Sequence, residues 1–138
     1  MRSRELIERY NAAWNARDVD AILTFHAPDM VFENHTAGEV AVGDEVREHI
    51  VGIFATWPDL SFRTRRLRTG TDHAVCEWIA TATHCRTMRR GEIVAEPTGR
   101  RLSWRGVDVF TIVGERITRK DVYSDSVTIL RELGLLPD

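Results

Sequence analysis

The sequence has 138 residues, a length typical of one domain, and its 43% hydrophobic and 29% charged residues exclude a disordered chain, a collagen and a disulfide scaffold. The 19 basic and 21 acidic residues leave a formal charge of −2, which argues against nucleic acid and anionic membranes as partners. We therefore expect a single domain that spans residues 1–138.

The first part of the chain has the periodicity of helices. Leu6, Tyr10 and Trp14 fall on one face at helical spacing, so we expect an amphipathic helix there. Asp18 is a suitable N-cap for a short second helix, which Pro28 should end.

A short strand and a third helix are predicted next. Residues 30–34 alternate in the manner of a strand, and the segment 36–43, which contains two glycines, is predicted to be a loop. Apolar residues then recur at helical spacing over 44–57, and Pro58 ends this third helix.

Alternation with a period of two dominates the second half of the chain. Four long runs are separated by polar turns, which predicts antiparallel pairing of consecutive strands. The segment between the second and third runs is expected to be a loop. The runs cover residues 60–69, 74–86, 100–113 and 116–124.

The chain is expected to finish with a helix, for which Asp125 can cap the first turn and Gly134 is a natural left-handed stop. Helices followed by antiparallel strands indicate an α+β domain. In it a strongly bent sheet forms a cone-shaped roll around the N-terminal helices and leaves a central pocket. Such a pocket is a natural site for a small molecule.

Other features bear on location and on excluded partners. The sequence has no apolar run of signal or membrane length, so we expect a cytoplasmic protein without membrane contact. Cys76 and Cys85 fall on one predicted strand, too far apart to pair. The arginines within 63–68 divide between two strand faces without interleaved aromatic residues, which favours a solvated or subunit-facing strand over a nucleic-acid site.

Two segments carry motifs. The pair Thr83-His84 and the turn Pro-Thr-Gly-Arg occur in the segment ATATHCRTMRRGEIVAEPTGRRLSWRGVDVF. Tyr123 stands two residues before Asp125 in the segment VYSDSVTILRELGLLP. With the order of elements, these motifs make the chain similar to the SnoaL-like polyketide cyclases of the nuclear transport factor 2 superfamily. The resemblance covers nearly the whole chain and implies that fold, but it leaves the reaction open, because the superfamily contains isomerases, cyclases and non-catalytic binders.

The related ketosteroid isomerases imply a set of site residues. The resemblance makes Tyr10 and Asp108 hydrogen-bond donors to a developing enolate oxygen, and it places Asn34 where an aspartate moves the proton. Because an amide accepts no proton near neutral pH, Asn34 is expected to orient the substrate instead. In the cyclases the acid/base residue corresponds to Val122, which is apolar.

Asp108 also stands out from the residues alone. It alternates with Trp104 and Phe110 on one strand face, where an unpaired carboxylate is costly and burial raises its pKa. It is either a protonated donor to a ligand or a carboxylate that pairs with an arginine or caps a loop. Tyr10 likewise either reaches a ligand or is a core tyrosine whose hydroxyl is satisfied elsewhere.

Two histidines are candidates for the missing proton carrier. His84 lies on the small, apolar face of its strand, and His35 follows the first strand into a loop. The alternatives are a hydrogen-bonded strand-end histidine for His84 and a solvent-exposed one for His35. His26, His49 and His73 are expected at the surface.

Aromatic side chains are expected to line the pocket, although at least one tryptophan should be plain core. The predicted substrate-binding residues are Trp14, Asn34, Phe54, Trp57, Trp78, Trp104 and Tyr123. The histidine and cysteine spacings match no zinc motif, so neither a metal nor a cofactor is expected.

Two hypotheses about function remain open. The first is a cofactor-independent cyclase or isomerase that stabilises the enolate of a small hydrophobic carbonyl compound, such as a polyketide or a steroid-like molecule. The second is a non-catalytic binding or assembly module, because no base stands at Asn34 or Val122. The long strands 74–86 and 100–113 also favour a homodimer.

Overall fold

The computed structural model describes residues 1–136; residues 137–138, the end of the domain expected from the sequence, lie outside this description. The helices are α1 (Ser3–Asn15), α2 (Val19–Leu23), α3 (Glu45–Thr56) and α4 (Ser126–Glu132). The strands are β1 (His26–Asn34), β2 (Glu39–Val42), β3 (Ser61–Thr69), β4 (His73–Thr83), β5 (Met88–Arg90), β6 (Ile93–Ala95), β7 (Arg101–Val113) and β8 (Arg116–Ser124).

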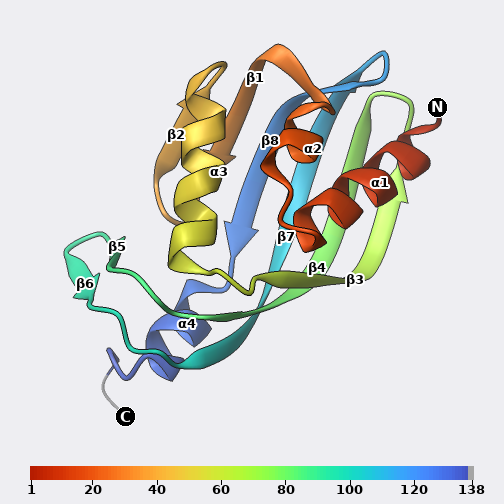
Figure 1. Ribbon diagram of the computed structural model, residues 1–138. Coiled ribbons are helices and arrows are strands. Elements are labelled where there is room, and N and C mark those ends of the chain that lie inside the picture. Colours follow the sequence, from red (N-terminus) through yellow and green to blue (C-terminus); the bar gives the residue numbers. More distant parts are fainter. Residues whose placement is uncertain (137–138) are drawn as a thin grey trace.

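Six strands form one curved sheet in the order β2-β1-β8-β7-β4-β3. Neighbouring strands are antiparallel, except that β1 and β8 run parallel. Helices α1, α2 and α3 lie against one face of the sheet, while α4 and the β5–β6 hairpin lie near one end of it (Figure 1). This arrangement confirms the expected α+β fold, a bent sheet around N-terminal helices.

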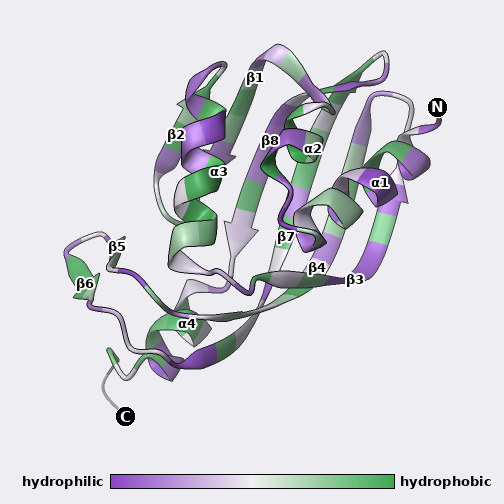
Figure 2. Cartoon of the chain, viewed as in Figure 1, coloured by the Kyte–Doolittle hydropathy of each residue, from purple (hydrophilic) through white to green (hydrophobic). Residues whose placement is uncertain are grey.

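Alternation along the central strands separates the core from the opposite face. In β4 the residues from Ala74 to Ala82 are buried at every second position, and the residues between them are partly exposed. Figure 2 shows the alternation as bands of hydrophobic and hydrophilic colour along the strands. The buried face packs against Ile7 and Tyr10 of α1 and Ile50 of α3. The site described below lies on this same face.

The meander predicted for the four long runs is present as β3-β4-β7-β8, but the parallel pairing of β1 with β8 departs from the wholly antiparallel sheet that the sequence predicts. β1 begins at His26 rather than at Met30, and its ladder with β8 is irregular between His26 and Val31. Pro28 falls within this irregularity, where its missing N–H is tolerated. Because most of the chain separates β1 from β8, local periodicity holds no information about their pairing.

Two segments predicted as loops contain short strands. β2 pairs with β1 and lies between Gly38 and Gly43, whose φ angles of 70° and 60° suit glycine. β5 and β6 pair with each other around Gly91 and form a hairpin outside the main sheet. Each of these strands has only three or four residues, too few to show a period.

Gly106 on β7 provides a test of how tightly the sheet packs. A Cβ atom added at Gly106 would lie 2.2 Å from the Trp78 ring. We therefore expect Gly106→Ala to lower the free energy of unfolding by about 1–3 kcal/mol, measured by urea unfolding followed by tryptophan fluorescence.

The matched control is Gly52→Ala in α3, where an added Cβ meets nothing within 4 Å. This substitution should stabilise the protein by about 0.5–1 kcal/mol, because alanine is the better helix former. Equal effects at the two glycines would show that the Trp78 ring is free to move aside.

Candidate functional site

A cavity of about 1020 Å³ lies between the helices and the inner face of the sheet. All four tryptophans of the chain line it, so these large rings wall the hollow instead of filling it. The aromatic lining residues are Trp14, Phe32, Trp57, Phe62, Trp78 and Trp104.

Six of the eleven residues expected at the site line this cavity. They are Trp14, Asn34, Trp57, Trp78, Trp104 and Asp108. The structure places the other five elsewhere. They are Tyr10, His35, Phe54, His84 and Tyr123.

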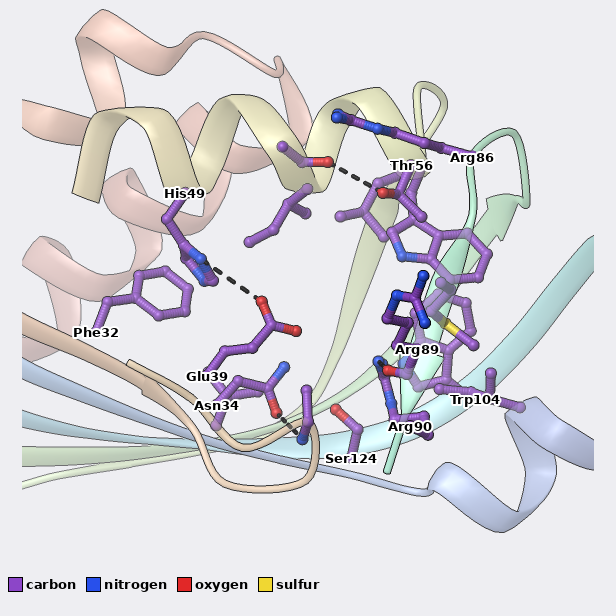
Figure 3. Close-up of a pocket in the computed structure, with 18 of the residues that line it drawn as sticks. Phe32, Asn34, Glu39, His49, Thr56, Arg86, Arg89, Arg90, Trp104 and Ser124 are labelled. Atoms are coloured by element: carbon purple, nitrogen blue, oxygen red, sulfur yellow. Dashed lines mark hydrogen bonds and ion pairs between the residues drawn. The ribbon is translucent and has the colours of Figure 1, made fainter. Parts of the chain in front are cut away.

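Charged side chains lie along part of the lining. Figure 3 shows Glu39 directed toward His49, with Arg89 and Arg90 on the opposite side. The His49 Nδ1 atom lies 3.8 Å from Glu39 Oε2, and the His49 side chain is 15% exposed. Burial lowers the pKa of His49, although the Glu39 charge opposes this shift, so His49 is a neutral imidazole at the cavity.

One charged pair is buried in the cavity wall. Asp108 on β7 and Lys120 on β8 both line the cavity, yet their side chains are only 8% and 5% exposed. Lys120 Nζ lies 3.8 Å from Asp108 Oδ2, which is an ion-pair distance but longer than a hydrogen bond. The two groups therefore face each other without a direct hydrogen bond.

Aromatic rings surround the Lys120 amine. Its Nζ lies 4.2 Å from the centre of a Trp14 ring, 4.9 Å from Phe32, 5.0 Å from Tyr10 and 5.8 Å from Phe110. The strand register builds this cage, because Phe32 on β1 and Phe110 on β7 are the direct partners of Lys120 on β8. The ring faces attract a cation and so replace part of its lost hydration.

Burial moves both members of the pair toward their neutral forms. Desolvation raises the pKa of Asp108 and lowers the pKa of Lys120, while the charge of each group opposes the shift of the other. The charged pair and the neutral acid with the neutral amine have the same net charge. The net charge of the cavity wall is therefore the same in either protonation state of the pair.

Lys120 is one of the cavity residues that the sequence analysis missed, together with His49 and Phe32. Lysines are usually exposed, so a lysine in a strand drew no attention. Two signals mark it nonetheless. It is the only lysine among the 19 basic residues, and the period of two places it on the same strand face as Val122.

Tyr10 is completely buried, its ring is part of the cage around Lys120, and it is not among the residues that line the cavity. The hydroxyl shares a hydrogen bond of 2.9 Å with Nε2 of His26. Burial raises the pKa of Tyr10 above its ordinary value, so the phenol stays protonated. Tyr10 and Asp108 thus lie on the same side of the sheet, both next to Lys120, but their polar groups do not converge on one cavity point.

His26 and His49 correct the expectation that three histidines lie at the surface. His26 is 7% exposed because it faces Tyr10 on the inner side of β1, and desolvation lowers its pKa to about 3. His49 lines the cavity, as described above. Only His73 is exposed as expected. A histidine carries no marker in the sequence for the partner that buries it.

His35 lies away from the cavity. Its ring stacks on Tyr123 with centres 4.5 Å apart, and its Nε2 lies 2.7 Å from Asp121 Oδ1. Glu33, His35 and Asp121 hold ligand-type atoms within 4.8 Å of one another. The Arg119 guanidinium already donates to both carboxylates, so an arginine occupies the position that a cation would need.

His84 and Phe54 support the cavity from behind its lining. His84 is fully buried against Trp57, and its Nδ1 accepts a hydrogen bond of 3.3 Å from the backbone N–H of Thr98. Phe54 packs against Trp14 with ring centres 5.3 Å apart. Both residues fix the angle of a tryptophan that does line the cavity.

Asn34 and Val122, the two positions where the family resemblance implies an acid or base, both line the cavity. Asn34 Oδ1 accepts a hydrogen bond of 3.0 Å from the backbone N–H of Ala37, so it closes the turn after β1. Val122 presents an apolar surface beside Asp108, its direct partner on β7. Neither side chain can accept a proton.

Several lining side chains have a buried nitrogen without a hydrogen-bond partner in residues 1–136. These atoms are Trp14 Nε1, Trp78 Nε1, His49 Nε2 and Arg90 Nε. An indole N–H can only donate. Burial raises the pKa of Asp108, and the indole of Trp78 opposes this shift. The indole of Trp14 likewise opposes the rise that burial causes in the pKa of Tyr10. Both N–H groups are therefore directed at protein oxygens, although neither makes a hydrogen bond of normal geometry.

The helices of residues 1–136 include none with both the length and the apolar character needed to span a bilayer.

Solved structures with the same architecture define the fold class. A protein of Catenulispora acidiphila with the ketosteroid isomerase-like fold has a TM-score of 0.80 and 18% identity, and the match covers 99% of this chain and 96% of that one. A SnoaL-like polyketide cyclase of Agrobacterium tumefaciens has a TM-score of 0.79 and 21% identity, with coverage of 97% and 99%. The chain therefore has the nuclear transport factor 2-like fold.

The family follows from the sequence. The model of the SnoaL-like domain matches residues 7–120, and this protein belongs to the SnoaL-like domain family. AclR of Streptomyces galilaeus, for which a hydroxylase function has been suggested, is similar at 26% identity and a TM-score of 0.79, with 98% of this chain and 86% of AclR covered. Curated protein sequences contain no match to the chain.

The buried His26 predicts a specific dependence of stability on pH. The unfolded chain binds a proton at His26 below a pKa of about 6.5, but the folded protein does so only near 3. The unfolded state therefore binds more protons in this window, and the contribution of His26 falls by about 1.4 kcal/mol for each pH unit of acidification. His26→Gln keeps a partner for Tyr10 and removes this titration.

Urea unfolding of the wild type and of His26→Gln at pH 7 and pH 5 measures the effect. The difference in free energy of unfolding between the two proteins should shift by about 2 kcal/mol in favour of the variant at pH 5. A difference that does not change with pH contradicts a neutral, buried His26.

Proposed function

We propose that this protein binds a small hydrophobic carbonyl compound in its aromatic cavity and catalyses proton transfer beside the carbonyl group, as a cyclase or an isomerase does. The single observation that carries this proposal is the buried Asp108–Lys120 pair in the cavity wall. Paired titratable groups whose pKa values burial shifts are typical of sites that move protons.

The chemistry of the lining supports the ligand class. Tryptophan and phenylalanine rings offer apolar area for a flat or polycyclic body, and the cavity volume is at the upper end of the range for small-molecule sites. The similarity to a SnoaL-like polyketide cyclase supports a polyketide-like compound of this kind.

The proposed roles follow from position. Asp108, held toward its protonated form by burial, donates a hydrogen bond to the ligand carbonyl oxygen and stabilises the enolate that forms. His49, neutral and open to the cavity, removes the proton from the adjacent carbon. His49 thus takes the role that the sequence suggested for His35 or His84. Tyr10 acts indirectly, as part of the cage around Lys120.

The second candidate function is a binding module without turnover. The observation that favours it is that Asn34 and Val122, the two positions where the resemblance implies an acid or base, line the cavity and offer no proton acceptor. Both candidates use the same cavity and the same ligand class, so only a measurement of reaction separates them.

We further propose that the chain forms a homodimer through the sheet face opposite the helices. Val107 and Val109 on β7 point to that face beside Tyr123 on β8, whose side chain is 46% exposed. Sedimentation of the wild type and of Tyr123→Glu tests this proposal: the wild type should sediment as a dimer and the variant as a monomer.

Replacing Asp108 by Asn tests the catalytic proposal. The amide keeps the shape of the side chain but is a weaker hydrogen-bond donor to a developing oxyanion than a protonated carboxyl, so we expect the enolate to be less stabilised and proton transfer to slow by a factor of about 10²–10³. The assay exposes a panel of hydrophobic aromatic ketones to the protein in heavy water and follows deuterium uptake beside the carbonyl by mass spectrometry. Binding is followed separately by the shift in melting temperature.

Asp29→Asn is the matched control, because Asp29 has the same side chain and is exposed on β1. It should leave uptake unchanged. Unchanged uptake and affinity in Asp108→Asn would refute the role of Asp108. Stabilisation of the wild type by ketones without deuterium uptake would favour the binding module instead.

A further inference from the structure

We propose that Lys120 is a nucleophile that forms an imine with the carbonyl group of a compound bound in the cavity. This inference rests on the proposed function, since it requires a carbonyl ligand, and it adds a covalent step at a residue that the hydrogen-bonding roles above leave unused. Imine formation requires an amine that is close to the ligand, desolvated and able to lose its proton.

The residue type is the first observation. All the basic residues of the chain except Lys120 are arginine, and the one amine side chain is the one buried at the cavity. Arginine would hold a positive charge at this place as well as lysine, but a guanidinium does not lose its proton in proteins. If the site required only a positive charge beside Asp108, arginine would serve as well, and the one lysine of the chain would have no advantage there.

The surroundings of the amine are the second observation. Lys120 lines the cavity, its side chain is 5% exposed, and no hydrogen bond holds its Nζ atom within residues 1–136. Asp108, at 3.8 Å, is within ion-pair distance of the amine but makes no hydrogen bond with it. A carbonyl carbon held between the aromatic walls therefore meets an amine with few competing partners.

The chemical step balances with the groups present. The lone pair of the neutral Lys120 amine adds to the carbonyl carbon, a C–N bond forms, and the C=O π electrons become an alkoxide that takes a proton from nitrogen. Asp108 then protonates the resulting hydroxyl, which leaves as water while the nitrogen lone pair forms the C=N bond. The product is a protonated imine beside an Asp108 carboxylate, and no oxidant or reductant takes part.

The cage that surrounds the amine also suits this product. The protonated imine places its positive charge among the rings of Trp14, Phe32 and Phe110, which stabilise a cation through their faces. The Asp108 carboxylate, freed of its proton, becomes its counter-ion. Such an imine withdraws electrons from the adjacent carbon more strongly than a ketone does, so it eases the proton transfer that His49 is proposed to perform.

The competing interpretation is that the pair is only structural. Replacing a buried ion pair by apolar residues is often neutral or stabilising, so stability alone is a weak reason to keep such a pair. A structural ion pair and a nucleophile also differ in a measurable way, because the first keeps its ammonium protonated and unreactive.

Reductive labelling tests the inference. The folded protein is incubated at pH 7 with 2-naphthaldehyde and cyanoborohydride, which converts any imine to a stable secondary amine that peptide mass spectrometry locates. The chain has two kinds of amine, Lys120 and its N-terminus, so the N-terminal label is an internal reference. We expect the ratio of Lys120 label to N-terminal label to be at least about tenfold higher in folded protein than in urea-unfolded protein, where lysine has its ordinary pKa.

Two variants control the experiment. Lys120→Met removes the amine, and Lys120→Arg keeps a cation; both should show the N-terminal label alone, with folding checked by circular dichroism. Folded wild type that carries the N-terminal label but no label at Lys120 would overturn the inference. So would a ratio that is the same in the folded and the unfolded chain.

The outcomes separate this inference from the proposed function. If ketones stabilise the protein and exchange deuterium but Lys120 is not labelled, proton transfer stands and the covalent step is wrong. If no ketone stabilises the protein or exchanges deuterium while the aldehyde labels Lys120 selectively, the amine is a nucleophile and the proposed proton transfer beside a ketone is wrong.

Discussion

The structure depends on one buried electrostatic contact, the approach of the Lys120 amine to the Asp108 carboxyl inside a ring of aromatic side chains. Neither group is stable alone at this depth, because removing one partner of a buried pair typically costs about 3–5 kcal/mol. The aromatic cage and the partner carboxyl together stabilise a lysine at a buried strand position, where most proteins have an apolar residue. The proposed chemistry of the cavity follows from this contact.

The sheet sets the contact through its register. Phe32, Lys120 and Phe110 form one row across β1, β8 and β7, and Asp108 with Val122 forms the next row on the same face. A slip of one residue in β8 would turn Lys120 to the opposite face and bring Arg119 or Asp121 inward. The parallel pairing of β1 with β8 is therefore part of the site, because it supplies one wall of the cage.

Much of the fold and part of the site could be predicted from the sequence. The period of two on 74–86 and 100–113 showed which face of each strand is buried, and so placed Asp108 and the tryptophans Trp78 and Trp104 inside. Family motifs showed the nuclear transport factor 2-like fold. These features are local, and local patterns are what a single sequence displays most clearly.

The rest could not be predicted, because it depends on contacts between distant parts of the chain. The direction of β1 against β8, the partner of Tyr10 and the burial of His26 are all set by pairs far apart in sequence. Lys120 was missed for a different reason. Its strand face could be predicted, but the general preference of lysine for the surface outweighed that period.

The protonation of Lys120 is the most direct test of the account. Because the chain has one lysine, protein labelled with carbon-13 at the lysine ε position gives a single nuclear magnetic resonance signal, whose shift follows the charge of the amine. The account predicts a titration midpoint below the ordinary value of 10.5, and a still lower midpoint in Asp108→Asn, where the carboxylate that raises the pKa of Lys120 is gone. A midpoint at or above 10.5 would show that the pair is a permanently charged ion pair and would contradict the account.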